Sequence, residues 1–176
     1  MRIILVGYPG SQRLLPFSKY LTSRYLSDFE IIYLNYEGKI AGWSNYVVDY
    51  LLKLGDEKVI LSLDDFLIRS AIDMDKFKIA KSMKPCVKLC YCTEQEHKEY
   101  PVTLQYTIWN RIELISLLRK TTTPWDFEIN GSKLFKGTSV VYSCMDYDTH
   151  SALSARWVGT KLDGIKLEDL EHYGQI

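Results

Sequence analysis

An apolar run that ends in two adjacent carboxylates constrains the fold of this chain more than any other feature. Val59 to Leu63 is almost entirely aliphatic, which is typical of a strand buried on both faces of a sheet. Such a strand cannot bury ionised carboxylates without partners, so we expect Asp64 and Asp65 at its carboxyl end. Ligands of open α/β sheets bind at this edge, where two carboxylates suit Mg²⁺ or Mn²⁺ with a diphosphate. The alternative is that one aspartate caps a helix that follows the strand.

Strand-like and helix-like segments alternate along the chain. The strand patterns lie at Arg2–Val6, Phe29–Leu34, Val59–Leu63 and Cys86–Thr93, and a final strand is expected at Ser139–Cys144. Helical spacing marks Leu14–Tyr25, Trp43–Leu54, Asp75–Lys84, Val102–Arg119 and a short helix opened by Pro124, with a charged loop at Glu94–Lys98. Strands separated by helices of this length imply βαβ units, so we predict an α/β fold with a mostly parallel sheet.

Length and charge limit the partners that we expect. The 176 residues suit a single domain, and the charged side chains balance to a formal net charge of zero. A balanced chain offers no electrostatic surface for nucleic acid, so we expect none as a partner. The apolar run from Met1 to Val6 is too short for a signal peptide or a membrane span. We therefore expect a cytoplasmic protein without a membrane span.

The loops after the first two predicted strands are candidates for nucleotide binding. Parallel strands deliver their loops to one edge of a sheet, which brings these loops together. We expect the base and ribose end of a pocket to be formed by Gly7, Tyr8, Tyr36, Glu37 and Gly38. The first loop has neither the dinucleotide-binding glycine pattern nor the P-loop pattern, so neither of those folds is expected. The alternative for the second loop is a turn that faces solvent.

Two acids lie near the start of the helix that Pro124 opens. Asp126 and Glu128 would be kept ionised there by the positive end of the helix dipole, which suits a general base. The same position suits an ordinary acid that caps the helix. Residues two apart do not share a helix face, so we expect the two carboxylates to point in different directions.

Other reactive side chains have simpler interpretations. The four cysteines lack the paired spacing of a zinc site and are interpreted as reduced packing residues; they are Cys86, Cys90, Cys92 and Cys144. The three histidines are scattered, and His150 alone is kept as a metal or phosphate candidate. Trp43 either stacks on a nucleobase or anchors the core. No serine or cysteine hydrolase motif is present.

Three segments occur in an order that is informative about the family of the chain. They are Leu63-Asp64-Asp65-Phe66, Pro101-Val102-Thr103-Leu104-Gln105-Tyr106-Thr107-Ile108-Trp109 and Pro124-Trp125-Asp126-Phe127-Glu128. In this order they resemble small GT-A-type glycosyltransferases of bacteria and large DNA viruses. The resemblance covers roughly residues 34 to 128. The adjacent aspartates depart from the common Asp-x-Asp pattern of that family.

The resemblance implies a function as well as a fold. The fold would be a GT-A-like three-layer α/β/α sandwich that binds a nucleoside diphosphate sugar, such as a UDP-sugar, and transfers the sugar to a carbohydrate or other hydroxyl acceptor. Mn²⁺ or Mg²⁺ would be held by Asp65 with Asp64, and the base would be Glu128 or Asp126. The sugar and acceptor pocket would be lined by Gln105, Trp109 and Trp125.

Two other classes of function stay open. The first is a non-catalytic domain that uses the same fold to bind a glycan or a partner. The second is a metal-dependent phosphohydrolase with a strand-end aspartate as nucleophile. That chemistry calls for a second acid two residues on and then a threonine, whereas Phe66 and Leu67 follow here. Metal-dependent hydrolysis of a UDP-sugar would separate a transferase from a binding domain.

Overall fold

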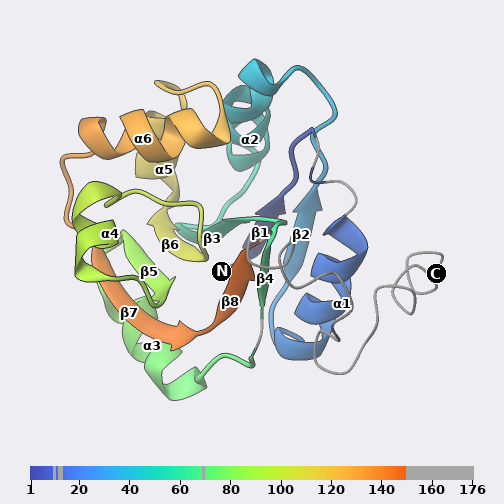
Figure 1. Ribbon diagram of the computed structural model, residues 1–176, viewed down its shortest axis with the longest axis vertical. Helices are drawn as coiled ribbons and strands as arrows, with labels where there is room; N and C mark the ends of the chain where they lie inside the picture. The colour runs from blue at the N-terminus through green and yellow to red at the C-terminus, as the bar shows by residue number, and fades with distance from the viewer. Residues whose placement is uncertain (10, 12–13, 69, 150–176) are drawn as a thin grey trace.

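Helices cover both faces of a central sheet in the computed structural model of the chain, which describes residues 1–9, 11, 14–68 and 70–149 (Figure 1). The strands are β1 (Ile3–Val6), β2 (Ile31–Leu34), β3 (Lys58–Leu63), β4 (Phe66–Ile68), β5 (Val87–Cys90), β6 (Thr107–Asn110), β7 (Val140–Met145) and β8 (Tyr147–Thr149). The helices are α1 (Leu15–Tyr25), the 3-10 turn η2 (Ile40–Gly42), α2 (Trp43–Leu51), α3 (Met74–Ser82), α4 (Glu94–Glu99), α5 (Arg111–Leu118) and α6 (Pro124–Leu134).

The sheet is mixed but mostly parallel. Within the described residues it has six strands in the order β2-β1-β3-β6-β5-β7, and β6 runs antiparallel to both of its neighbours. The remaining neighbours pair in parallel. The short strands β4 and β8 form a separate antiparallel pair. The predicted α/β class with a mostly parallel sheet is therefore confirmed.

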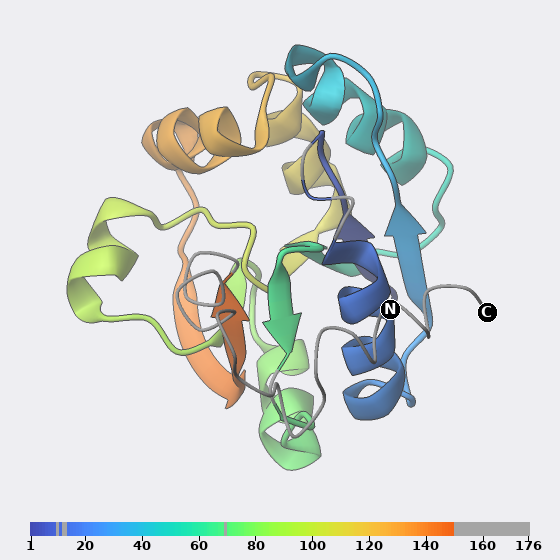
Figure 2. The ribbon, with the colours of Figure 1, turned by 45° about the vertical axis from the view of Figure 1, so that its right-hand side comes forward.

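Alternating residues of the central strands point into two apolar layers. On one face, α2, α5 and α6 pack against β1 and β3, and Trp43 lies fully buried in this layer. Trp43 is thus a core anchor and not a stacking surface for a base. On the other face, α3 lies against β5 and β7 and buries Phe77 in the second layer. Helix α1 lies beside β4 (Figure 2), where Phe17 and Leu21 pack on Leu67.

The predicted helix from Val102 to Arg119 is wrong in its first half. The chain runs through the extended strand β6 and becomes helical only at Arg111. The change occurs at Asn110, whose side chain accepts hydrogen bonds from the amides of Ile112 and Glu113 and so caps α5. The apolar spacing that suggested one helix crosses the boundary between a largely buried strand and a helix that buries Leu114, Ile115, Leu117 and Leu118.

Two further predictions need correction. The segment expected to be a charged loop is the helix α4, opened by a capping box in which Thr93 and Glu96 bind each other's backbone amides. The strand predicted at Ser139–Cys144 is β7, but it is followed by β8 and is not the final strand.

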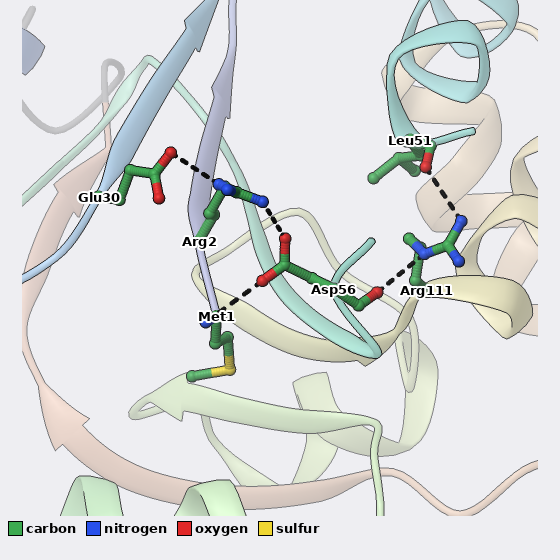
Figure 3. A network of polar contacts seen from close by, with 6 residues as sticks. All are labelled: Met1, Arg2, Glu30, Leu51, Asp56 and Arg111. Carbon is green, nitrogen blue, oxygen red and sulfur yellow. Dashed lines mark hydrogen bonds and ion pairs between the residues drawn. The ribbon is translucent and has the colours of Figure 1, made fainter. Parts of the chain in front are cut away.

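A network of ion pairs and hydrogen bonds connects residues near the amino-terminal ends of β1, β2 and β3 (Figure 3). Asp56 pairs with the amino group of Met1 at 3.3 Å and with the guanidinium of Arg2, which also binds Glu30 at 2.7 Å. Arg111 donates to the backbone carbonyl of Asp56 at 2.8 Å. This network lies at the opposite end of β3 from Asp64 and Asp65, so its charges serve the scaffold. Among the described residues, no helix is long and apolar enough to cross a membrane.

Candidate functional site

The loops after β1, β2 and β3 meet at one edge of the sheet, as predicted. Val6 pairs with Leu34 on one side and with Leu63 on the other, so the three strands end at the same level. The amide of Gly7 donates to the carbonyl of Leu34 at 2.8 Å, and the amide of Asp64 donates to that of Val6 at 3.3 Å. The candidate site is therefore built on backbone that the sheet holds in place.

Asp64 is buried against the first loop. Its side chain is only 1% exposed, and its Oδ2 lies 3.0 Å from the hydroxyl of Ser11, which donates to it. A Cβ added to Gly7 would lie 2.8 Å from that oxygen and 3.4 Å from Oδ1 of Asn35. Gly7 is thus needed for the close approach of the carboxylate to the backbone.

Two buried oxygens beside Gly7 have no hydrogen-bond partner among the described residues. They are Oδ1 of Asp64 and Oδ1 of Asn35, which directly follows β2. Sequence reasoning did not select Asn35 or Ser11. The position of Asn35 at a strand end is the signal that could have found it, while the contact of Ser11 with Asp64 has no counterpart in the sequence pattern.

Burial raises the pKa of Asp64 to about 7, and the negative charge of Asp65 adds to this effect. The hydrogen bond from Ser11 opposes the shift but does not cancel it. Asp64 therefore gains or loses a proton near neutral pH. No helix follows either aspartate, since β4 begins at Phe66, so the capping interpretation of these residues is wrong.

We predict that Asp64 makes the stability of the protein fall as the pH rises. The folded state binds its proton more tightly than the unfolded state, where the pKa is near the ordinary value of 3.8. The stabilisation is complete below about pH 4 and is lost as the pH rises through about 7. Relative to wild type, Asp64→Asn should gain a few kcal/mol of unfolding free energy across this range, at about 1.4 kcal/mol per pKa unit. Urea unfolding in EDTA at several pH values measures it, and parallel curves for the two proteins would contradict it.

Asp65 lies in a more open position and joins three parts of the chain. The phenol of Tyr8 donates to its Oδ2 at 2.8 Å. The ring of Tyr8 meets that of Trp125 edge to face, with 5.4 Å between centroids. Trp125 is 52% exposed and lies in the first turn of α6. The loop after β1, the turn after β3 and the start of α6 therefore come together around Asp65.

Glu128 is partly buried on α6 and binds the segment that precedes β6. Its Oε1 accepts from the hydroxyl of Thr103 at 2.9 Å and from the amide of Leu104 at 2.8 Å. Among the described residues its Oε2 has no hydrogen-bond partner. One oxygen is thus fixed by the protein, and the other is available to a ligand.

Burial raises the pKa of Glu128, and the nearby charge of Asp65 raises it further. The bonds from Leu104 and Thr103 and the positive charge of Lys88 oppose this rise. The expectation that the helix dipole lowers this pKa is wrong, because Glu128 lies beyond the first turn of α6 and desolvation dominates.

Asp126 has the capping role that was the alternative for it. Its Oδ2 accepts from the amide of Thr122 at 2.7 Å, and its Oδ1 accepts from the side-chain amide of Asn130 at 2.6 Å. These bonds, that of Asn130 first, lower the pKa of Asp126. The two acids of α6 point in different directions, as predicted, and only Glu128 is directed toward the site.

The structure separates Gln105 from Trp109. Gln105 is half-buried next to Leu104, whose carbonyl accepts from Leu63 at the end of β3. Trp109 pairs with Val59 at the opposite end of β3 and is fully buried against Phe127. Gln105 therefore lies near the site, whereas Trp109 belongs to the core and cannot line a sugar pocket.

The turn after β2 lies at the same edge of the sheet as Asp64 and Asp65, but some of its side chains bind other residues of the turn. The phenol of Tyr36 donates to the carbonyl of Lys39 at 2.6 Å, and its ring packs on Tyr46. A Cβ on Gly38 would lie 2.5 Å from the Tyr36 hydroxyl oxygen, so glycine lets the ring fold over the turn. Glu37 is exposed and accepts from Asn35 at 3.0 Å. Contact of these residues with a nucleotide remains a prediction.

The acids of the site suit a metal that is shared with a diphosphate. Within the described part of the chain, no group of three or more His, Cys, Asp or Glu side chains could hold an ion by itself. Mg²⁺ commonly uses one or two carboxylates and takes its other ligands from phosphates and water. Asp65 fits that donor set, while Asp64 is buried and faces Ser11. His150 lies outside the described residues.

The cysteines are packing residues, as interpreted from their spacing. All four are free thiols, and Cys86, Cys90 and Cys144 are buried. Burial raises the pKa of Cys86 to about 12 and that of Cys144 to about 11. These two thiols are therefore not ionised at neutral pH.

Comparisons with known proteins inform the fold and not the function. No protein-family model matches the chain, and no curated protein matches it. Among solved structures, the chain is similar to the crystal structure of A197 from STIV, with a TM-score of 0.50 and 16% sequence identity over 85% of each chain. At this identity the similarity supports the α/β fold alone.

Proposed function

We propose that the protein is a glycosyltransferase that transfers a sugar from a nucleoside diphosphate sugar, such as a UDP-sugar, on a GT-A-type domain. One observation carries the proposal. The three segments whose order resembles that family make contact in space, because Glu128 binds Thr103 and Leu104, and the amide of Leu63 donates to the carbonyl of Leu104 at 3.2 Å. Segments about 25 to 60 residues apart thereby form one site at the ligand-binding edge of an α/β sheet.

Each side chain has a role in this proposal. Asp65, oriented by Tyr8, faces the diphosphate, and a divalent cation bound there with the diphosphate would neutralise the charge of the leaving group. Glu128 is the base, since Oε1 is fixed by the protein and Oε2 can accept the proton of an acceptor hydroxyl. The exposed ring of Trp125 offers an apolar face to a sugar.

Asp64 holds the first loop of the site in place. Its buried carboxyl holds Ser11 and packs against Gly7, so it fixes the loop that carries Tyr8. In this proposal Asp65 is the direct metal ligand, and Asp64 positions the loop.

A screen of nucleotide sugars tests the proposal. The protein is incubated with single UDP-, GDP- and TDP-sugars and Mn²⁺, with EDTA as the control, and release of free nucleoside diphosphate is measured. Slow release from one donor with Mn²⁺ but not with EDTA is the expected result. If no donor is cleaved or raises the melting temperature, the proposal fails. Binding of a glycan without any cleavage would instead support the non-catalytic alternative.

A further inference from the structure

Lys88 is a buried lysine on β5, the strand next to the edge strand β7 of the sheet. It lies on β5 opposite Thr107 of β6, and its side chain is only 2% exposed. Its ammonium donates a hydrogen bond to the carbonyl of Tyr100, and no carboxylate forms an ion pair with it among the described residues. A buried charge is costly without compensation, so this position calls for an explanation.

The segment from Tyr100 to Gln105 is bound along its length. Lys88 binds the carbonyl of Tyr100 at its start. Ser132 of α6 binds both the amide and the carbonyl of Val102, at 3.1 and 3.2 Å. Glu128 then binds Thr103 and Leu104 at its end. Two opposite charges, one from the sheet and one from α6, thus hold the same segment from its two ends.

Several charged or ionisable groups face this pair. Burial lowers the pKa of Lys88, and the charges of four nearby groups oppose this shift: Cys92, Cys86, Glu128 and Glu96. The charge of Lys88 in turn helps to lower the pKa of His97, after burial. Glu128 is faced by Asp65, which disfavours its ionised form, and by Lys88, which favours it. Of the two charged groups that shift the pKa of Glu128, Lys88 carries the positive charge.

We propose that Lys88 is a positioning residue for the site: its ammonium holds the start of the segment whose end is bound by Glu128. The assignment of Glu128 as a base rests on the proposed function, but the binding of one segment by both Lys88 and Glu128 does not. Lys88 does not touch the proposed substrate. It acts through the segment that leads to Gln105 and through the charge of Glu128.

The link between Lys88 and Glu128 is tested by titrating the Glu128 side-chain carboxyl carbon by NMR, with the signal assigned through its loss in Glu128→Gln. In Lys88→Met the midpoint should move to higher pH, because the positive charge is lost while the length of the side chain is kept. Lys88→Arg should return the midpoint toward wild type. Lys78→Met, which removes an exposed lysine of α3, is the matched control and should leave it unchanged. Equal midpoints in wild type and folded Lys88→Met would overturn the proposal.

A reverse measurement covers the case in which Lys88→Met does not fold. Loss of the Glu128 charge should lower the pKa of Lys88, so the Lys88 side-chain signal of Glu128→Gln should titrate at lower pH than in wild type. An unchanged Lys88 midpoint would also overturn the proposal.

Catalysis provides a further readout once a donor is known. Lys88→Met should lower kcat by about tenfold to a hundredfold, the usual scale for a misplaced catalytic group, with little change in the donor KM. Its acid limb of kcat should move to higher pH. If wild type transfers no sugar at all, the proposed function fails, whereas the NMR titration still decides whether Lys88 supports the Glu128 carboxylate. If wild type is active and Lys88→Met keeps its kcat, the positioning role is wrong.

Discussion

Glu128→Gln is expected to lower sugar transfer by about two to four orders of magnitude, the usual worth of general-base catalysis. The amide keeps an oxygen that can accept from Thr103 and Leu104, so the segment before β6 should stay in place. What is lost is the capacity of the second oxygen to take a proton. Donor affinity should be preserved, since Glu128 is placed on the acceptor side. Steady-state kinetics with donor binding by calorimetry measures both quantities.

The pH profile adds a second test of the same residue. Because burial and the charge of Asp65 raise the pKa of Glu128, the base is ionised only above a pH higher than that of an ordinary glutamate. Turnover of wild type should therefore fall on the acid side at a pH above the usual glutamate range. This limb should be absent from the residual activity of Glu128→Gln.

Asp126→Asn is the matched control for Glu128→Gln. It changes a carboxylate of the same helix two residues away, but that carboxylate is engaged by Thr122 and Asn130. The expected result is near-normal turnover with a loss of about 1 kcal/mol in unfolding free energy, the usual scale for a helix cap. A large loss of turnover in Asp126→Asn with little effect of Glu128→Gln would reassign the base. If neither variant affects turnover, α6 takes no part in the chemistry.

The sequence predicts those parts of the fold in which one pattern dominates a whole element. Val59 to Leu63 reads as a strand buried on both faces, and β3 is buried along this stretch. The segment from residue 102 to 119 fails because its apolar residues belong to two elements with different periods. The change of period is marked by a capping asparagine, Asn110, and similarly by Thr93 and Glu96 at α4. These capping residues mark the starts of α4 and α5, which the spacing of apolar residues does not reveal.

The sequence predicts only those residues of the candidate site that lie at the carboxyl ends of the strands or at the start of α6. Asp65, Tyr8 and Trp125 meet because parallel strands and the start of α6 bring their ends together. The sequence does not indicate that Asp64 and Asp65 differ in burial. Asp64 is buried and Asp65 is only partly buried, although they are identical side chains one position apart. Both lie in the turn between β3 and β4, and only tertiary packing decides which of the two is buried.

Asp65→Asn is expected to abolish metal-dependent nucleotide binding without unfolding the protein. The neutral amide can still accept the hydrogen bond from Tyr8, so the local structure should persist. It cannot supply the negative charge that a divalent cation requires beside a diphosphate. Calorimetry with UDP should show binding to wild type in Mn²⁺, weak or no binding in EDTA, and no binding to Asp65→Asn in either condition.

Asp64→Asn separates the charge of the metal ligand from that of its neighbour. Asp64 is buried with a pKa of about 7, so a large part of the population is already uncharged at neutral pH. If Asp65 is the direct ligand, Asp64→Asn should keep Mn²⁺-dependent UDP binding within roughly tenfold of wild type, because only a neighbouring charge has changed. Loss of binding in Asp64→Asn together with retention in Asp65→Asn would exchange the two roles. Equal UDP affinity of wild type in Mn²⁺ and in EDTA would remove the metal from the mechanism altogether, because two acids at this edge would otherwise repel the diphosphate.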